Sequence, residues 1–136
     1  MAVDIIGYWE GLNPKSQEWE VIRSVASDRS YIWFGIIGGV RCGFDKDLFL
    51  NNGFTNLPHN RGLPKDVSEQ TRFTLTDMVG VNNHNWLTQA EVNMCLGIWF
   101  KLIPLENQSA IVSTIIPAYG KRMYTQVRMV FGFKNV

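Results

Sequence analysis

The chain has 136 residues, the size of one small domain, and we treat residues 1–136 as a single domain. Its apolar fraction of 46% is near the globular average, which excludes a chain that is disordered throughout. Thirteen basic and twelve acidic side chains leave a formal charge of +1, so the composition argues against a protein held to extended nucleic acid by phosphate neutralisation.

Cysteine content and hydropathy indicate the compartment. Cys42 and Cys95 are too few for the disulfide framework of a small secreted domain, and neither has the spacing of a zinc ligand. The start of the chain lacks the basic region of a signal peptide, and the longest apolar run, residues 31–40, is far shorter than the roughly 20 residues that span a bilayer. We expect free thiols, no metal, no cofactor, no membrane contact and a cytoplasmic setting.

The first predicted element is a β-hairpin. Residues 3–9 are rich in β-forming side chains, and residues 18–25 alternate apolar and polar positions. The segment between them is dense in turn residues such as Asn13 and Pro14.

Residues 30–41 predict a buried helix that begins after a capping serine or aspartate. Gly35, Gly38 and Gly39 weaken this prediction, because glycine costs roughly 1 kcal/mol against alanine inside a helix. Small residues at these positions would permit a close approach of a neighbouring backbone or a ligand.

The next stretch, from Cys42 to Pro64, is predicted to be mostly irregular, and an irregular segment of this length is usually functional or mobile. We expect residues 42–60 to line or cover a binding site. Ser68 then begins a short helix that ends before Gly80.

The second half contains the clearest local signal. Thr88 and Glu91 have the spacing of a capping box, which predicts a helix over about residues 88–97. Residues 98–120 are compatible with a helix or a strand. Side chains in residues 127–133 follow the alternating pattern that is typical of a core strand. The predicted fold is α+β: a small antiparallel sheet, made of the N-terminal hairpin and the C-terminal strand, with two to four helices packed on one face and a long irregular loop.

One candidate site lies just before the capping box, where Asn82, Asn83, His84, Asn85 and Trp86 follow one another. Amides, an imidazole and an indole near a helix N-terminus would suit an anion or a ribose phosphate. The alternative is structural: the asparagines form turns, His84 binds a carbonyl group, and Trp86 fills the core.

A second candidate set is four arginines that each lie beside an aromatic, glycine or apolar segment: Arg29, Arg41, Arg61 and Arg128. Arginine binds phosphate bidentately and stacks on planar rings. The alternative is ordinary pairing with Asp28, Asp45, Asp66 or Glu91.

The evidence for catalysis is thin. No nucleophile elbow, phosphate-binding glycine loop or zinc-protease motif is present. The five tryptophans, four tyrosines and eight phenylalanines instead offer many flat apolar faces, and those beside basic residues would stack on a nucleobase. We therefore expect a ligand-binding site formed by seven residues: Arg29, Tyr31, Arg41, Arg61, His84, Asn85 and Trp86.

In the order and spacing of several short motifs, the chain resembles a group of small, mostly uncharacterised bacteriophage proteins. The matching residues span about 29–133: Arg29-Ser30-Tyr31, Phe34, Gly39-Val40-Arg41, Arg61-Gly62-Leu63-Pro64, Asp66, Ser68, His84-Asn85-Trp86-Leu87-Thr88, Glu91 and Val127-Arg128-Met129-Val130-Phe131. The chain has Asn82 and Asn85 where the family pattern has His and Ser, which argues against a two-histidine site.

The resemblance implies a phage protein that acts in the host cytoplasm. By analogy with phage proteins that counter host defence, we expect a homo-oligomer that sequesters a small phosphorylated nucleotide signal, such as a cyclic nucleotide or an ADP-ribose derivative, without cleaving it. Two alternatives stay open: a hydrolase of such a signal with His84 as acid or base, and an inhibitor that binds a host defence protein through exposed aromatic side chains.

Overall fold

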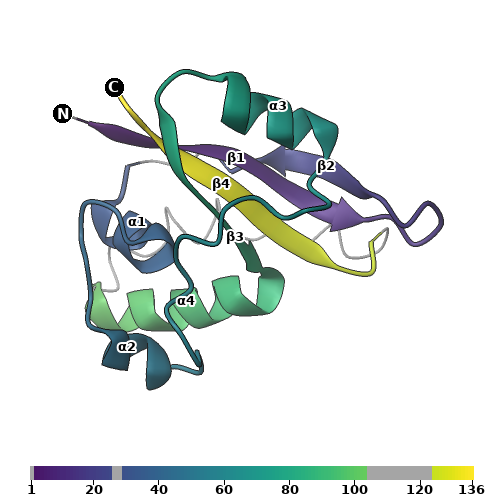
Figure 1. Cartoon of the computed structure of the whole chain (residues 1–136). Coiled ribbons are helices and arrows are strands. Elements are labelled where there is room, and N and C mark those ends of the chain that lie inside the picture. The colour runs from purple at the N-terminus through teal and green to yellow at the C-terminus, as the bar shows by residue number, and fades with distance from the viewer. Residues whose placement is uncertain (1, 26–28, 104–123) are drawn as a thin grey trace.

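A four-stranded antiparallel sheet with helices on both faces forms the protein (Figure 1). The computed structural model describes residues 2–25, 29–103 and 124–136. Its elements are β1 (Val3–Leu12), β2 (Trp19–Ser24), α1 (Tyr31–Gly38), α2 (Lys46–Leu50), α3 (Glu69–Asp77), β3 (Val81–Thr88), α4 (Gln89–Leu102) and β4 (Val127–Asn135). The strand order is β2-β1-β4-β3, so the α+β prediction is confirmed.

The predicted hairpin is present, and the predicted C-terminal strand lies next to it at the centre of the sheet. β1 pairs antiparallel with β2, with Leu12 opposite Trp19. On its other side β1 pairs antiparallel with β4 along nearly its whole length, from Val3 opposite Asn135 to Gly11 opposite Val127. The two central strands therefore come from opposite ends of the described chain.

Successive side chains along each strand point to opposite faces of the sheet, and both faces carry apolar side chains. Ile5, Leu87 and Phe131 belong to the larger core, on the side of α1, α2 and α4. Val130 belongs to a smaller core with Leu75 of α3, on the opposite side. The sequence led us to expect helices on one face only; the structure corrects this, because both faces carry apolar side chains that must be removed from water.

Helix start signals in the sequence are confirmed. The side chains of Ser30 and Ser68 accept hydrogen bonds from the backbone of the first turns of α1 and α3. Thr88 and Glu91 form both bonds of the capping box at the start of α4, and α4 runs to Leu102, five residues beyond the predicted end.

The glycines of α1 are explained by close packing. A Cβ atom at Gly35 would lie 1.8 Å from the carbonyl oxygen of Cys42, so the segment after α1 returns directly over the helix. A Cβ at Gly38 would meet the ring of Phe133. Gly39 ends the helix with a φ of +70°, a left-handed conformation that glycine adopts without strain.

One expectation for the middle of the chain is corrected and another is confirmed. Residues 82–86 are not a turn before a helix but part of β3, which contains an irregularity between Asn82 and Asn85 with Asn83 at a φ of +55°. The stretch from Cys42 to Pro64 contains the short helix α2 and is otherwise irregular, as predicted. Residues 104–120 of the ambiguous segment lie outside the described residues.

Three further findings concern the described residues only. No described helix is long and apolar enough to cross a bilayer. No group of three or more potential metal ligands occurs among the described side chains. Cys42 is half-buried, Cys95 is buried, and both carry free thiols.

Candidate functional site

The seven residues predicted to form one site lie in separate groups. Arg29, Tyr31 and Arg41 surround the start of β1 and α1. Arg29 forms an exposed ion pair with Asp4, with 2.6 Å between Arg29 Nε and Asp4 Oδ1. The guanidinium of Arg41 lies 4.6 Å from the centre of the Tyr31 ring. A polar cluster exists here, but none of its three residues lines the cavity described below.

Arg61, Asn85 and Trp86 form the second group. Arg61 binds Glu91 bidentately at 2.7 and 2.5 Å, and its guanidinium lies 5.2 Å from the Trp86 ring. Asn85 is fully buried, and its side-chain amide donates to the carbonyls of Ile37 and Pro58. Its side-chain oxygen accepts a hydrogen bond from the backbone N–H of Arg61. Asn85 therefore joins β3 to α1 and to the segment before Arg61.

Both histidines are bound to backbone carbonyls. His84 Nε2 donates to Leu75 O at 2.9 Å, which ties β3 to α3. His59 Nε2 donates to Ile36 O at 2.8 Å, and burial lowers the pKa of this imidazole despite that bond. Neither histidine lines the cavity described below.

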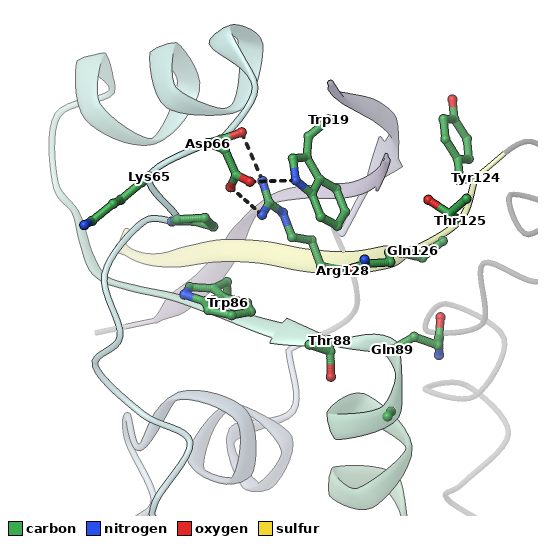
Figure 2. A pocket seen from close by; sticks show the side chains of 13 residues that line it. Trp19, Lys65, Asp66, Trp86, Thr88, Gln89, Tyr124, Thr125, Gln126 and Arg128 are labelled. Atoms are coloured by element: carbon green, nitrogen blue, oxygen red, sulfur yellow. Dashed lines mark hydrogen bonds and ion pairs between the residues drawn. The ribbon is translucent and has the colours of Figure 1, made fainter. Parts of the chain in front are cut away.

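A cavity that we call the tryptophan pocket has a volume of about 780 Å³. It lies at the end of the sheet where β1 and β3 end and β2 and β4 begin (Figure 2). It is lined by Trp19, Pro64, Lys65, Asp66, Trp86, Thr88, Gln89, Ala90, Tyr124, Thr125, Gln126, Val127 and Arg128. The volume is typical of small-molecule sites, and mostly apolar walls with a few polar groups are their usual lining. Trp86 is the one predicted site residue that lines it.

Arg128 forms the polar centre of this pocket. Its side chain is only 5% exposed and binds Glu10 of β1, with 2.8 Å between Nη2 and Oε1. Its Nη1 donates to Asp66 Oδ1 at 2.9 Å, and its guanidinium lies 3.6 Å from the centre of the Trp19 ring. Trp19 Nε1 donates to Asp66 Oδ2 at 3.0 Å, so Asp66 holds both the cation and the indole (Figure 2).

Both carboxylates of this network are held by hydrogen bonds. The hydrogen bond from Arg128 holds the pKa of Asp66 below its usual range. Glu10 is fully buried, and its second oxygen accepts from Ser68 N at 3.0 Å and from Thr71 Oγ1 at 2.7 Å. These bonds attach the start of α3 to β1 and fix one wall of the pocket.

The opposite wall is Trp86 and the start of α4. Arg61 also donates from Nη1 to the Trp86 carbonyl at 3.1 Å, and Glu91 accepts from Thr88 N at 3.0 Å. The Arg61–Glu91 pair thus connects the segment that leads to Lys65 with the β3–α4 junction. Two indoles, one from each side of β4, therefore border the same cavity (Figure 2).

Asp66 was among the acids that the sequence offered as partners of the four arginines, and the structure pairs it with Arg128. The sequence did not reveal Trp19 and Glu10 as partners of Arg128. Arg128 and Asp66 are 62 positions apart, and Arg128 and Glu10 are 118 positions apart. The one available signal was the polar Glu10 and Arg128 inside otherwise apolar strands, because a charged residue in a core strand requires a partner.

Comparison of the chain with protein-family models, curated proteins and solved structures found no match.

Proposed function

We propose that this protein binds a small nucleotide-derived molecule in the tryptophan pocket and holds it without cleaving it. The observation that carries the proposal is the pair of indoles, Trp19 and Trp86, that border one cavity of about 780 Å³. Stacking of a base on an aromatic side chain contributes roughly 1–3 kcal/mol and tolerates different bases. Threonine and glutamine side chains at the rim offer hydrogen bonds to base edges and ribose hydroxyls.

The lining favours binding over hydrolysis. No histidine, cysteine or serine is among the residues that line the pocket, and its carboxylate, Asp66, is engaged by Arg128 and Trp19. His84, the acid or base of the hydrolase hypothesis, donates to Leu75 O instead. The resemblance to small phage proteins supplies the proposed setting: the ligand would be an immune signal of the infected bacterium, withdrawn from solution by binding.

The test is binding followed by recovery of the ligand. The protein is titrated with cyclic nucleotides and cyclic ADP-ribose isomers in a calorimeter, then heated, and the released molecule is analysed by chromatography. We expect one or more members to bind and to be released unchanged. Altered products would overturn sequestration in favour of hydrolysis.

Variants locate the site. Trp86→Leu is expected to weaken binding by about tenfold, the loss of one stacking partner. Phe73→Leu changes an exposed aromatic of α3 that does not line the pocket, and it should bind as the wild type does. Equal affinity of both variants would place binding elsewhere. Thermal midpoints of the variants confirm that each one is folded.

A second candidate function is binding to a host defence protein. The observation that favours it is the exposure of Phe73 and Val79, which are 66% and 88% exposed on and just after α3. A plaque assay distinguishes the two functions. In cells that carry a nucleotide-signalling defence, expression of this protein should restore phage plaques. Loss of plaques with Trp86→Leu supports ligand sequestration, and loss with Phe73→Asp supports the protein partner.

A further inference from the structure

The charge of Arg128 is already balanced inside the protein. Its guanidinium faces Glu10 and Asp66, one positive charge against two negative ones. Nε donates to Glu10 at 2.9 Å, Nη1 to Asp66 Oδ1 at 2.9 Å, and Nη2 to the Asp66 carbonyl at 3.3 Å. The face of the guanidinium is covered by Trp19.

Among the described residues that line the pocket, no guanidinium is therefore available to a phosphate. Among the residues that line the pocket, the other cation is Lys65, which is exposed and whose side chain is directed away from the Trp19–Arg128 cluster (Figure 2). Exposed ion pairs contribute roughly 0–1 kcal/mol and are screened by salt. The carboxylate of Asp66, with a side chain 67% exposed, would repel the phosphate at the same time.

We infer that the tryptophan pocket recognises the ring and sugar of its ligand rather than the phosphate, and that Asp66 is the residue that sets this preference. The inference rests on the proposed function and narrows its ligand class to nucleosides and to nucleotides whose phosphates remain at the rim in solvent. Asp66 acts by neutralising Arg128 and by fixing the Trp19 indole through its Nε1–H.

Matched ligand pairs test the wild-type protein. Adenosine is compared with its 5′-monophosphate and diphosphate, and guanosine with its phosphates, by calorimetry at low and at 0.5 M salt. Each nucleoside and its monophosphate should bind with dissociation constants within about threefold of one another, because an exposed Lys65–phosphate pair adds little. Salt should leave the affinity nearly unchanged. The inference would be overturned if each added phosphate raised the binding affinity by about tenfold or more and if high salt removed this gain.

The variant Asp66→Asn tests the assigned residue. The asparagine side chain can still accept a bond from Trp19 or Arg128, but it leaves Arg128 with one carboxylate instead of two. We expect the ratio of monophosphate to nucleoside affinity to rise by about tenfold, the scale of a charge-assisted hydrogen bond. The control Asp47→Asn removes the same charge from α2, on the other side of the sheet, and should leave the ratio unchanged.

The outcomes separate the two claims. An unchanged ratio in Asp66→Asn, or an equal rise in both variants, would overturn the role of Asp66. Tight binding of nucleotides with weak binding of nucleosides would overturn the ring preference but leave the proposed function standing. Absence of binding by every nucleoside and nucleotide would overturn both. If Asp66→Asn does not fold, the wild-type salt series alone decides whether phosphate contributes.

Discussion

At the scale of single residues, Glu10 and Arg128 are the charged residues that are buried in the described part of the chain. Glu10 has no exposed surface, and the Arg128 side chain is 5% exposed. Burying two charges costs several kcal/mol each, and their attraction and remaining hydrogen bonds must offset this cost. The pair therefore contributes little net stability, but loss of one partner leaves an uncompensated charge in the core.

This asymmetry gives a first prediction. Arg128→Met should lower the free energy of unfolding by about 3–5 kcal/mol, because it leaves the Glu10 carboxylate buried without its cation. Adding Glu10→Gln removes that charge and keeps an oxygen for Ser68 N and Thr71, so the double variant should be more stable than Arg128→Met alone. Urea unfolding measures both. A double variant less stable than the single one would contradict a charge-based cause.

At the scale of elements, replacing one glycine in α1 and one in α4 by alanine should change the stability of the protein in opposite directions. Gly35→Ala places a methyl group against the Cys42 carbonyl and should destabilise the protein by about 1–3 kcal/mol. Gly97 of α4 has open space where a Cβ would lie, so Gly97→Ala should stabilise by about 0.5–1 kcal/mol through helix propensity. Thermal midpoints should shift in opposite directions. A shift in the same direction would mean that propensity or packing alone governs both helices.

The ion pair between Arg61 and Glu91 at the start of α4 gives a pH prediction. Burial raises the pKa of Glu91, but bonds from Arg61 and the Thr88 N–H outweigh it and hold the pKa below its usual range. A carboxyl group with a lowered folded-state pKa contributes stability above its unfolded pKa, and this contribution is lost as the pH falls through the folded pKa.

Stability should therefore fall between about pH 5 and pH 3, and less steeply in Glu91→Gln than in the wild type. The measurement is the urea midpoint across this range. The control is Glu18→Gln, which changes an exposed carboxyl of the hairpin turn and should keep the wild-type slope. Parallel curves for wild type and Glu91→Gln would remove Glu91 from the acid response.

Sequence reasoning succeeded for elements whose signals are local. Ser30, Ser68 and Thr88 mark their helices within three residues of the bonds they accept, and the hairpin strands alternate as strands do. It failed for β3, because three asparagines and a histidine are typical of turns. In the structure, His84 donates to the Leu75 carbonyl of α3 and Asn85 donates to the Ile37 carbonyl of α1. These partners allow the polar residues to lie in a strand.

At the scale of the whole molecule, the candidate site depends on contacts that no local pattern reveals. Trp86 was predicted because an indole beside polar residues is visible in sequence. Trp19 was not, because its contact with Arg128 requires the sheet order β2-β1-β4-β3 to be known. Asp66 was named only as one of several acids that could pair with an arginine, and the structure assigns it to Arg128. Arg61 pairs with Glu91, 30 positions away, which confirms for this arginine the alternative of ordinary pairing with one of the named acids.

Assembly remains a prediction at this scale. With a formal charge of +1 the molecule has little electrostatic repulsion between copies, and Phe73 and Val79 expose apolar surface. We expect a two-fold dimer, the commonest homo-oligomer. Light scattering at high micromolar concentration should give twice the chain mass of 15.5 kDa. A single species of one chain mass would contradict it.

The position of β4 has a consequence for how the protein is made. β3 pairs with no described strand other than β4, and β4 begins 39 residues after β3 ends. During synthesis, β3 and the exposed edge of β1 must wait without a partner until residues 127–135 have left the ribosome. The sheet therefore cannot be completed before β4 is available, and chaperone binding should be strongest while the growing chain lacks that strand.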